Sequence, residues 1–103
     1  MNDYKKLFEG KTILVTGGTG YLGRQLVKRL LELNPCAVRV LSRDEVKHHR
    51  LQEEFKYDER IRNFIGDVRD LPRLEKAMNA CDIVIHAAAL KRIDLIEYNV
   101  GEA

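Results

Sequence analysis

The 103-residue sequence contains no apolar run long enough to cross a membrane, and its polar opening, MNDYKK, lacks the apolar centre of a signal peptide. It also lacks a strong excess of either charge. Charged residues make up 33% of the chain, but the formal net charge is only +2. We therefore expect a cytoplasmic protein without a membrane segment and without a general attraction to nucleic acid.

Cysteine is scarce as well. The two cysteines, Cys36 and Cys81, are far apart in the sequence and match no metal-binding or redox spacing. Because disulfides are rare in cytosolic proteins, we interpret both as reduced thiols in the core. Internal repeats, low-complexity stretches and linkers are absent too, so residues 1–103 are expected to form one small domain with a single core.

The remaining sequence alternates between segments typical of buried strands and segments typical of helices. Short apolar runs predict strands at residues 11–16, 37–42, 61–66 and 82–89. An amphipathic helix is predicted after the first strand, ending at Asn34 because Pro35 cannot continue it. Further helices are predicted at residues 44–57 and after Asp70, and residues 95–103 are expected to begin another.

This βαβαβαβ order predicts an α/β fold with a parallel sheet and right-handed crossovers. The expected architecture is the N-terminal half of a three-layer Rossmann-type sheet, with four strands in the order 3-2-1-4. Ser42 and Glu45 match a capping box for the second helix, and Asp70 is the expected cap of the third, with Pro72 in its first turn. The apolar fourth strand would have a free edge, so we expect self-association through it.

The segment TGGTGYLG, residues 16–23, lies between the first strand and the first helix. Glycine costs conformational entropy, so these glycines indicate a backbone that needs positive φ or the close approach of a ligand. Such a turn directs backbone N–H groups and the positive end of a helix dipole at an anion. Gly17 would form the turn, Gly20 would admit a pyrophosphate, and Gly23 would let the helix pack on the strand. A tight turn without a ligand is the alternative.

The end of the second strand bears on the choice of dinucleotide. An acid about twenty residues after the glycines would accept a hydrogen bond from a ribose 2′-hydroxyl and select NAD. The sequence has Ser42 and Arg43 there, and a guanidinium can pair with a 2′-phosphate, so NADP is favoured over NAD. Asp44 is the residue that argues for NAD, although capping the next helix is its expected role. Lys47 either adds charge at the same phosphate or is a solvated lysine.

Five segments together resemble the extended short-chain dehydrogenase/reductase superfamily: TGGTGYLG, LSRDE, FIGDVRD, VIHAAALK and EYN. Within it they are most similar to the sugar-nucleotide 4,6-dehydratases of polysaccharide and glycan biosynthesis, the UDP-N-acetylglucosamine 4,6-dehydratase (CapD-like) group. The resemblance runs from about Phe8 to the end of the sequence. It implies an NADP-dependent lyase that oxidises the sugar at C4, eliminates water across C5 and C6, and returns the hydride at C6.

The resemblance also implies which residues contact the cofactor. They are Gly17, Thr19, Gly20, Tyr21, Leu22, Gly23, Ser42, Arg43, Lys47, Asp67, Val68, Ala87, Ala88 and Lys91. In the family, the aspartate at the Asp67 position accepts a hydrogen bond from the adenine amino group, with help from the next backbone unit; a loop acid without a ligand is the alternative. Small side chains at Ala87 and Ala88 suit a cofactor that passes over the backbone. Lys91 is either a cofactor or substrate contact or a surface lysine.

Two other polar features are interpreted without a ligand. His86, within the apolar fourth strand, is taken as a core histidine rather than a catalyst. The basic cluster KHHR, residues 47–50, has acids on both sides, so a solvated helix face is favoured over a nucleic-acid contact.

Catalysis in the resembled group uses a Tyr-x-x-x-Lys pair, but none of the tyrosines here has a lysine four residues later. We therefore interpret the chain as the cofactor segment of a homo-oligomeric enzyme that acts on a nucleotide sugar, with no catalytic residues and no metal of its own. The alternatives are a stand-alone NAD(P)-binding sensor, an interaction module with a vestigial nucleotide site, and a segment of another epimerase or reductase of the superfamily.

Overall fold

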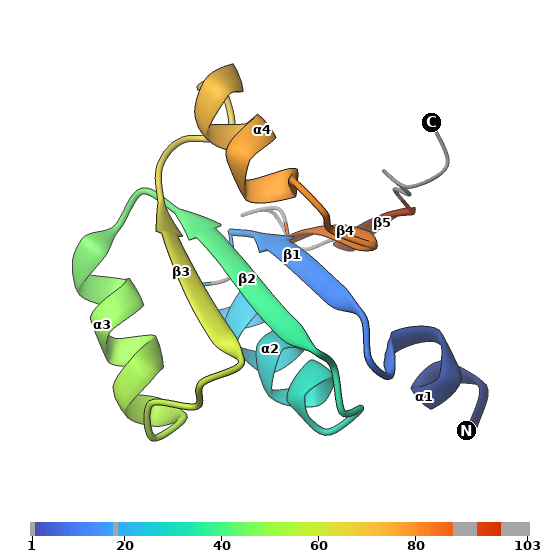
Figure 1. Cartoon of the computed structure of the whole chain (residues 1–103). Helices are drawn as coiled ribbons and strands as arrows, with labels where there is room; N and C mark the ends of the chain where they lie inside the picture. Colours follow the sequence, from blue (N-terminus) through green and yellow to red (C-terminus); the bar gives the residue numbers. More distant parts are fainter. Residues whose placement is uncertain (1, 18, 88–92, 98–103) are drawn as a thin grey trace.

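The computed structural model describes residues 2–17, 19–87 and 93–97 (Figure 1). Its elements are α1 (Asn2–Phe8), β1 (Thr12–Thr16), α2 (Tyr21–Leu31), β2 (Ala37–Ser42), α3 (Glu45–Glu54), β3 (Ile61–Ile65), α4 (Leu71–Met78), β4 (Ile83–Ala87) and β5 (Ile93–Glu97). The strands form one sheet in the order β3-β2-β1-β4-β5. β1 to β4 pair in parallel, which confirms the predicted four-stranded order 3-2-1-4.

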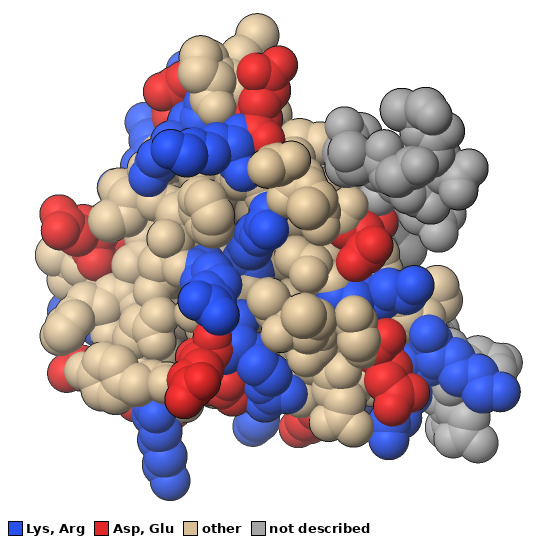
Figure 2. All heavy atoms as spheres, viewed as in Figure 1, with Lys and Arg blue, Asp and Glu red and all other residues tan. Residues whose placement is uncertain are grey.

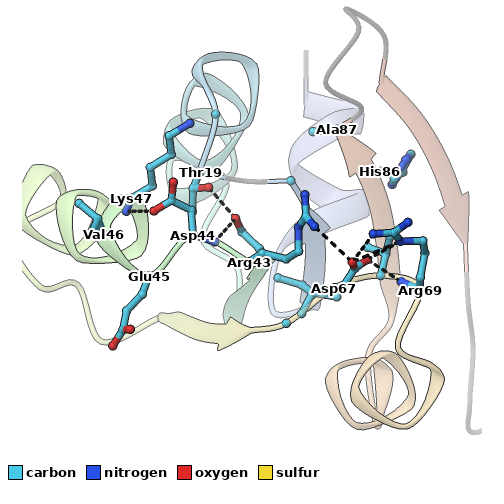
Figure 3. A pocket seen from close by; sticks show the side chains of 16 residues that line it. Thr19, Arg43, Asp44, Glu45, Val46, Lys47, Asp67, Arg69, His86 and Ala87 are labelled. Carbon is cyan, nitrogen blue, oxygen red and sulfur yellow. Dashed lines mark hydrogen bonds and ion pairs between the residues drawn. The ribbon is translucent and has the colours of Figure 1, made fainter.

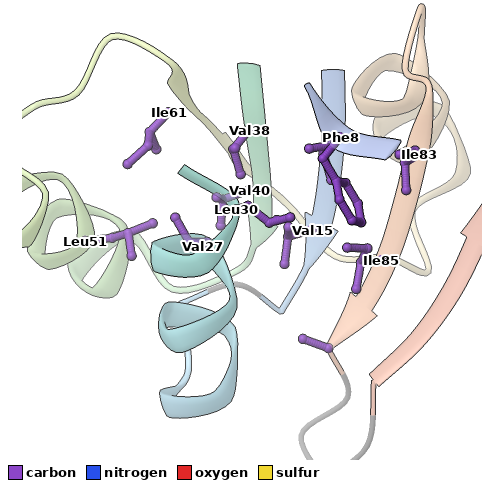
Figure 4. Packing of buried hydrophobic residues seen from close by; sticks show 12 residues of the cluster. Phe8, Val15, Val27, Leu30, Val38, Val40, Leu51, Ile61, Ile83 and Ile85 are labelled. Carbon is purple, nitrogen blue, oxygen red and sulfur yellow. The ribbon is translucent and has the colours of Figure 1, made fainter. Parts of the chain in front are cut away.

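One face of the sheet carries the larger core. Alternate residues of a strand face opposite sides, so Val15, Val40 and Ile85 all face α2 and α3. Val27 of α2 and Leu51 of α3 pack against them, and both are fully buried (Figure 4). Because the apolar side of each helix packs against the strands, α2 and α3 have fixed positions on this face of the sheet.

The other face of the sheet is covered by α4. Leu14, Leu41 and Val84 form a second cluster there with Ala77 and Cys81. The sheet is therefore buried on both faces, which is why its parallel strands are continuous apolar runs rather than alternating ones. Basic and acidic side chains are interspersed on the molecular face shown in Figure 2.

The two cysteines differ in their surroundings. Both are free thiols, as expected, but only Cys81 is in the core, where burial raises the pKa of its thiol. Cys36 is exposed, so its predicted place in the core is wrong. It directly precedes β2, and its neighbour Pro35 is buried instead. Sequence spacing alone cannot say which of two adjacent apolar residues faces inward.

The helix caps differ from one helix to the next. Asp44 is the N-cap of α3, with its Oδ1 accepting from the Lys47 N–H at 3.0 Å, so the predicted capping box of Ser42 and Glu45 is wrong. Asp70 caps α4 by accepting from the Arg73 N–H at 3.3 Å, as predicted. The N-cap of α2 is Gly20, which offers no side chain to the free N–H groups of the first turn.

The second crossover, from β2 through α3 to β3, differs from the prediction in two ways. α3 ends at Glu54 rather than at residue 57, because Lys56 and Tyr57 both take left-handed φ values of 56°. His48 is buried, so the KHHR cluster is not a wholly solvated face. Its ring nitrogens hydrogen-bond the Asn63 side chain at 2.7 Å and the Ser42 carbonyl oxygen at 3.1 Å, which fastens α3 to β2 and β3.

The elements at the two ends of the described chain, α1 and β5, were not predicted. α1 lacks an apolar period, and its place is set by Phe8, which joins the larger core. Residues 93–97 form the strand β5, antiparallel to β4, where the sequence predicted the start of a helix from residue 95. β4 is therefore not a free edge, and the basis for self-association through it does not hold. A homo-oligomer stays a prediction that needs another surface.

Candidate dinucleotide site

A cleft of about 1180 Å³ opens at the carboxyl ends of the parallel strands. It is lined by Gly17, Thr19, Gly20, Leu41, Ser42, Arg43, Asp44, Glu45, Val46, Lys47, Gly66, Asp67, Val68, Arg69, His86 and Ala87. These residues lie at the carboxyl ends of β1, β2, β3 and β4, which are neighbours in the sheet, or in the segments that leave those ends. Open parallel sheets place their ligand sites in this position, because the loops leaving the strands converge there.

The turn after β1 is built around Gly17. Its φ is +75°, a conformation that favours glycine, and its N–H donates to the Leu41 carbonyl oxygen at 2.9 Å. A Cβ at this position would clash with the Ala87 carbonyl oxygen on β4. Gly17 therefore brings β1, β2 and β4 together at the floor of the cleft, as the predicted tight turn requires.

Gly20 has a different reason to be glycine. Among the described residues other than its chain neighbours, the nearest atom to a Cβ there is the Gly17 carbonyl oxygen at 3.9 Å, so these residues leave space for a side chain. Gly20 also precedes the first turn of α2, which has neither a capping side chain nor an acidic residue. Free N–H groups and the helix dipole make such an end favourable for an anion. The open cradle fits a phosphate group.

A hydroxyl pair joins this turn to the end of β2. The Thr19 and Ser42 hydroxyls are 2.8 Å apart, and Thr19 is buried. Ser42 Oγ also accepts from the Asp44 N–H at 3.3 Å. The side chains that the sequence assigned to a phosphate and to a ribose are thus parts of one hydrogen-bonded unit.

Arg43 and Lys47 are the basic residues next to Ser42 in the cleft. The Arg43 side chain is 72% exposed, and its Nη1 lies 3.6 Å from Asp67 Oδ2. Asp44, the acid that argued for NAD, accepts from the Lys47 backbone N–H as the cap of α3. Its carboxylate is therefore already engaged by the protein.

Asp67 is bound by arginines on two sides (Figure 3). Arg69 Nη2 donates to Asp67 Oδ2 at 2.8 Å, and the Arg69 backbone N–H donates to Oδ1 at 2.9 Å. The hydrogen bonds from the Arg69 side chain and backbone, with a smaller contribution from the Arg43 charge, lower the Asp67 pKa to about 2. The carboxylate is thus ionised at neutral pH.

His86 belongs to the cleft as well as to β4. Its side chain is half-buried, and its Nδ1 hydrogen-bonds the Thr16 hydroxyl of the neighbouring strand. The ring is held by the protein, as expected for a core histidine, yet it also lines the cleft floor. Sequence reasoning placed it in the core alone.

The cleft brings together most, but not all, of the residues that the sequence assigned to the cofactor. Those lining it are Gly17, Thr19, Gly20, Ser42, Arg43, Lys47, Asp67, Val68 and Ala87. Tyr21, Leu22 and Gly23 form the first turn of α2 without lining the cleft. Ala88 and Lys91 lie outside the described residues.

Sequence reasoning missed Arg69 and His86 in the cleft. Arg69 had a usable signal, because an arginine two residues after an aspartate can turn back onto it. Among the described residues, no cluster of three or more His, Cys, Asp or Glu side chains suited to a metal occurs, and no helix is both long and apolar enough to span a membrane.

A family model described as "Polysaccharide biosynthesis protein" matches residues 13–103. The chain belongs to this family. Residues 13–103 include the glycine turn and every residue that lines the cleft. The family assignment thus covers the whole candidate site and not only the sheet beneath it.

Two curated relatives are about equally identical to this chain in sequence. A protein named as an uncharacterized membrane protein of Methanocaldococcus jannaschii is 50% identical over 101 residues, covering 98% of this chain and 30% of the relative. A UDP-N-acetylglucosamine 4,6-dehydratase (inverting) of Campylobacter jejuni is 48% identical over 97 residues, covering 93% of this chain and 29% of the relative. The chain thus spans under a third of the length of these relatives.

Solved structures agree on the fold. Pen from Bacillus thuringiensis matches with a TM-score of 0.77 and 42% identity, over 82% of this chain and 27% of that one. The Bordetella bronchiseptica enzyme WbmF, in complex with NAD⁺ and UDP, matches with a TM-score of 0.65 and 27% identity, over 82% and 24%. The chain is thus a Rossmann-type segment of the short-chain dehydrogenase/reductase superfamily.

Proposed function

We propose that the chain binds NADP(H) as the cofactor segment of a nucleotide-sugar 4,6-dehydratase, with UDP-N-acetylglucosamine as the substrate of the whole enzyme. The observation that carries the NADP assignment is the end of β2, where an exposed arginine follows Ser42 and the nearby acid caps α3. The substrate assignment draws on the Campylobacter relative. A cytoplasmic location is part of the same proposal.

The order of the strands supports a dinucleotide that runs from the end of β1, across the end of β2, to the end of β3. β1, β2 and β3 are neighbours, spaced by about 4.8 Å as in any sheet. The anion cradle of Gly20 follows β1, Ser42 and Arg43 end β2, and Asp67 follows β3. Because pyrophosphate, ribose and base succeed one another along the dinucleotide, this order of sites supports a proposal in which Gly20 binds the phosphates, Ser42 the ribose and Asp67 the base.

The chemistry of these residues fits each part of the ligand. The N-terminus of α2 binds the pyrophosphate through free N–H groups. Arg43 and Lys47 provide positive charge for a 2′-phosphate, and the guanidinium can bind it in two-pronged fashion. A bound nicotinamide would supply the acceptance and return of a hydride. The cleft residues named here would bind and orient the cofactor.

Calorimetric titration of the chain with NADP⁺ and NAD⁺ tests the cofactor assignment. We expect NADP⁺ to bind roughly tenfold or more tightly, since a charge-assisted contact to the 2′-phosphate is present in only one ligand. Arg43→Glu should remove or reverse this preference. Arg50→Glu, the same charge change at an exposed position of α3 outside the cleft, should retain it. Equal affinities in the unsubstituted chain would contradict the assignment.

The chain alone should not carry out the sugar chemistry, because the sequence contains no Tyr-x-x-x-Lys pair to remove the proton from the sugar hydroxyl. We expect no 4-keto-6-deoxy product from UDP-N-acetylglucosamine above a control without protein. Formation of that product would show that another acid–base pair is present.

A further inference from the structure

Arg69 makes an unusually complete set of contacts with one carboxylate. Its backbone N–H donates to Asp67 Oδ1 at 2.9 Å, its Nε to the same oxygen at 3.2 Å, and its Nη2 to Oδ2 at 2.8 Å. The guanidinium thus forms a two-pronged pair with the carboxylate, while the backbone closes a tight turn onto it. Both torsions of the Asp67 side chain are fixed by this one residue.

Stability does not account for this arrangement. The Arg69 side chain is 79% exposed and the Asp67 side chain 26% exposed, so the pair lies at the surface of the cleft. Exposed ion pairs contribute little to the free energy of unfolding, since water and salt screen them. What the pair does provide is a carboxylate with a single orientation beside the ligand cleft.

The contacts leave one acceptor position open. A carboxylate has about four lone-pair sites, and Arg69 directs three N–H groups at it: the backbone N–H at Oδ1, the Nη2 N–H at Oδ2, and the Nε N–H shared between both oxygens at 3.2 Å each. Arg43 is on the remaining side of Oδ2, but its Nη1 is 3.6 Å away, beyond hydrogen-bond distance. Figure 3 shows the two arginines on different sides of the carboxylate. Three N–H donors for about four lone-pair sites leave the carboxylate able to accept one further N–H.

We infer that Arg69 is a positioning residue, which fixes the Asp67 carboxylate so that it accepts a hydrogen bond from the exocyclic amino group of the adenine base. This inference rests on the proposed function, which places the base at the end of β3. An ionised carboxylate only accepts hydrogen bonds, so it favours a base with an amino group and disfavours one with a carbonyl oxygen at the same position. Arg69 thereby sets the base specificity of the site without contacting the base.

Titration with two nucleotides tests the inference by binding rather than by activity. The ligands are NADP⁺ and its hypoxanthine analogue, in which a carbonyl oxygen replaces the adenine amino group. The unsubstituted chain should bind NADP⁺ about tenfold more tightly, because the analogue directs an acceptor at the carboxylate and leaves both groups unpaired. Asp67→Ala should bring the ratio of the two affinities to about one.

Variants at Arg69 separate positioning from charge and from folding. Arg69→Gln should lower the ratio to below about threefold, and Arg69→Lys should not restore it, because an ammonium group cannot form the two-pronged pair. In the Asp67→Ala background, Arg69→Gln should leave the ratio unchanged. Arg62→Gln is the matched control: it removes the same charge at an exposed position of β3 outside the cleft and should keep the full ratio.

The outcomes distinguish this inference from the function on which it rests. If the unsubstituted chain binds neither nucleotide, the proposed function fails and the inference falls with it. If both nucleotides bind and the ratio is unaffected by Arg69→Gln, only the inference is overturned. A full ratio in Arg69→Lys would overturn the role of the two-pronged pair. Circular dichroism of each variant shows whether a chain with a reduced affinity ratio is still folded. If Arg69→Gln is unfolded, the affinity ratio of Arg69→Lys tests the inference instead.

Discussion

The Thr19 hydroxyl lies 2.8 Å from the Ser42 hydroxyl, so the turn after β1 is joined directly to the end of β2. Twenty-three residues separate the two in sequence, including the whole of α2. Parallel pairing of β1 with β2 brings their carboxyl ends together, with Thr16 opposite Leu41. The phosphate and ribose portions of the candidate site are thereby coupled through two side chains.

Thr19→Val tests this coupling, because valine keeps the shape of threonine and removes only the hydroxyl. We expect the free energy of unfolding to fall by about 1 kcal/mol, the usual net contribution of a hydrogen bond. Urea denaturation of Thr19→Val, Ser42→Ala and the double variant gives the interaction between the two residues. Strictly additive effects would show that the hydroxyls do not stabilise each other.

Gly20→Val should abolish dinucleotide binding while the chain remains folded. The added side chain would occupy the space before α2, where the nearest described atom outside the chain neighbours is the Gly17 carbonyl oxygen, 3.9 Å from the Cβ. Titration with NADP⁺ and circular dichroism measure the two effects. Gly17→Ala is the contrasting variant: its left-handed φ and the clash with Ala87 should lower stability itself, by about 1–3 kcal/mol. Unchanged affinity in a folded Gly20→Val chain would refute the anion cradle.

The Asp67 carboxyl should titrate well below the ordinary range of aspartate. Its pKa of about 2 lies below the ordinary value of 3.8, so the small contribution of this pair to the free energy of unfolding is present above about pH 4 and is lost as the pH falls toward 2. Carbon NMR of the Asp67 carboxyl between pH 2 and pH 6 measures the midpoint. Removing the main cause in Arg69→Gln should raise the pKa toward 3.8. An identical midpoint in both chains would contradict the stated cause.

The two thiols should react at very different rates. Cys36 is exposed, whereas Cys81 is buried and burial raises the pKa of its thiol, which lowers the thiolate fraction. An excess of a thiol reagent at neutral pH should therefore modify one cysteine quickly and the second only as the chain unfolds. Cys36→Ser should remove the fast phase, and two fast phases would show that Cys81 is accessible.

The alternation of strands and helices followed from the sequence because it depends on local periodicity. The strand at residues 37–42 and the caps at Asp44 and Asp70 were visible in residue types alone. The glycine turn was equally visible, since its spacing between a strand and a helix has few other physical explanations. Each of these features depends only on residues that lie close together in the sequence.

Features that depend on a distant partner were not visible. Phe8 anchors α1 only because the larger core accepts it, and His48 is buried only because Asn63 and the Ser42 carbonyl oxygen satisfy its ring. β5 forms because it pairs with β4. The hydrogen bonds that it makes with the N–H and C=O groups of β4 outweigh any local preference for a helix.

The sequence by itself therefore determined the parallel sheet and the kinds of groups available to a dinucleotide. The tertiary structure decided how those groups act together: which acid caps a helix, which carboxylate two arginines share, and which turn is tied to which strand. The physical reason is that hydrogen bonds and ion pairs depend on distances of about 3 Å. Only the packing of strands from different parts of the chain brings Thr19 to Ser42 and Arg43 to Asp67.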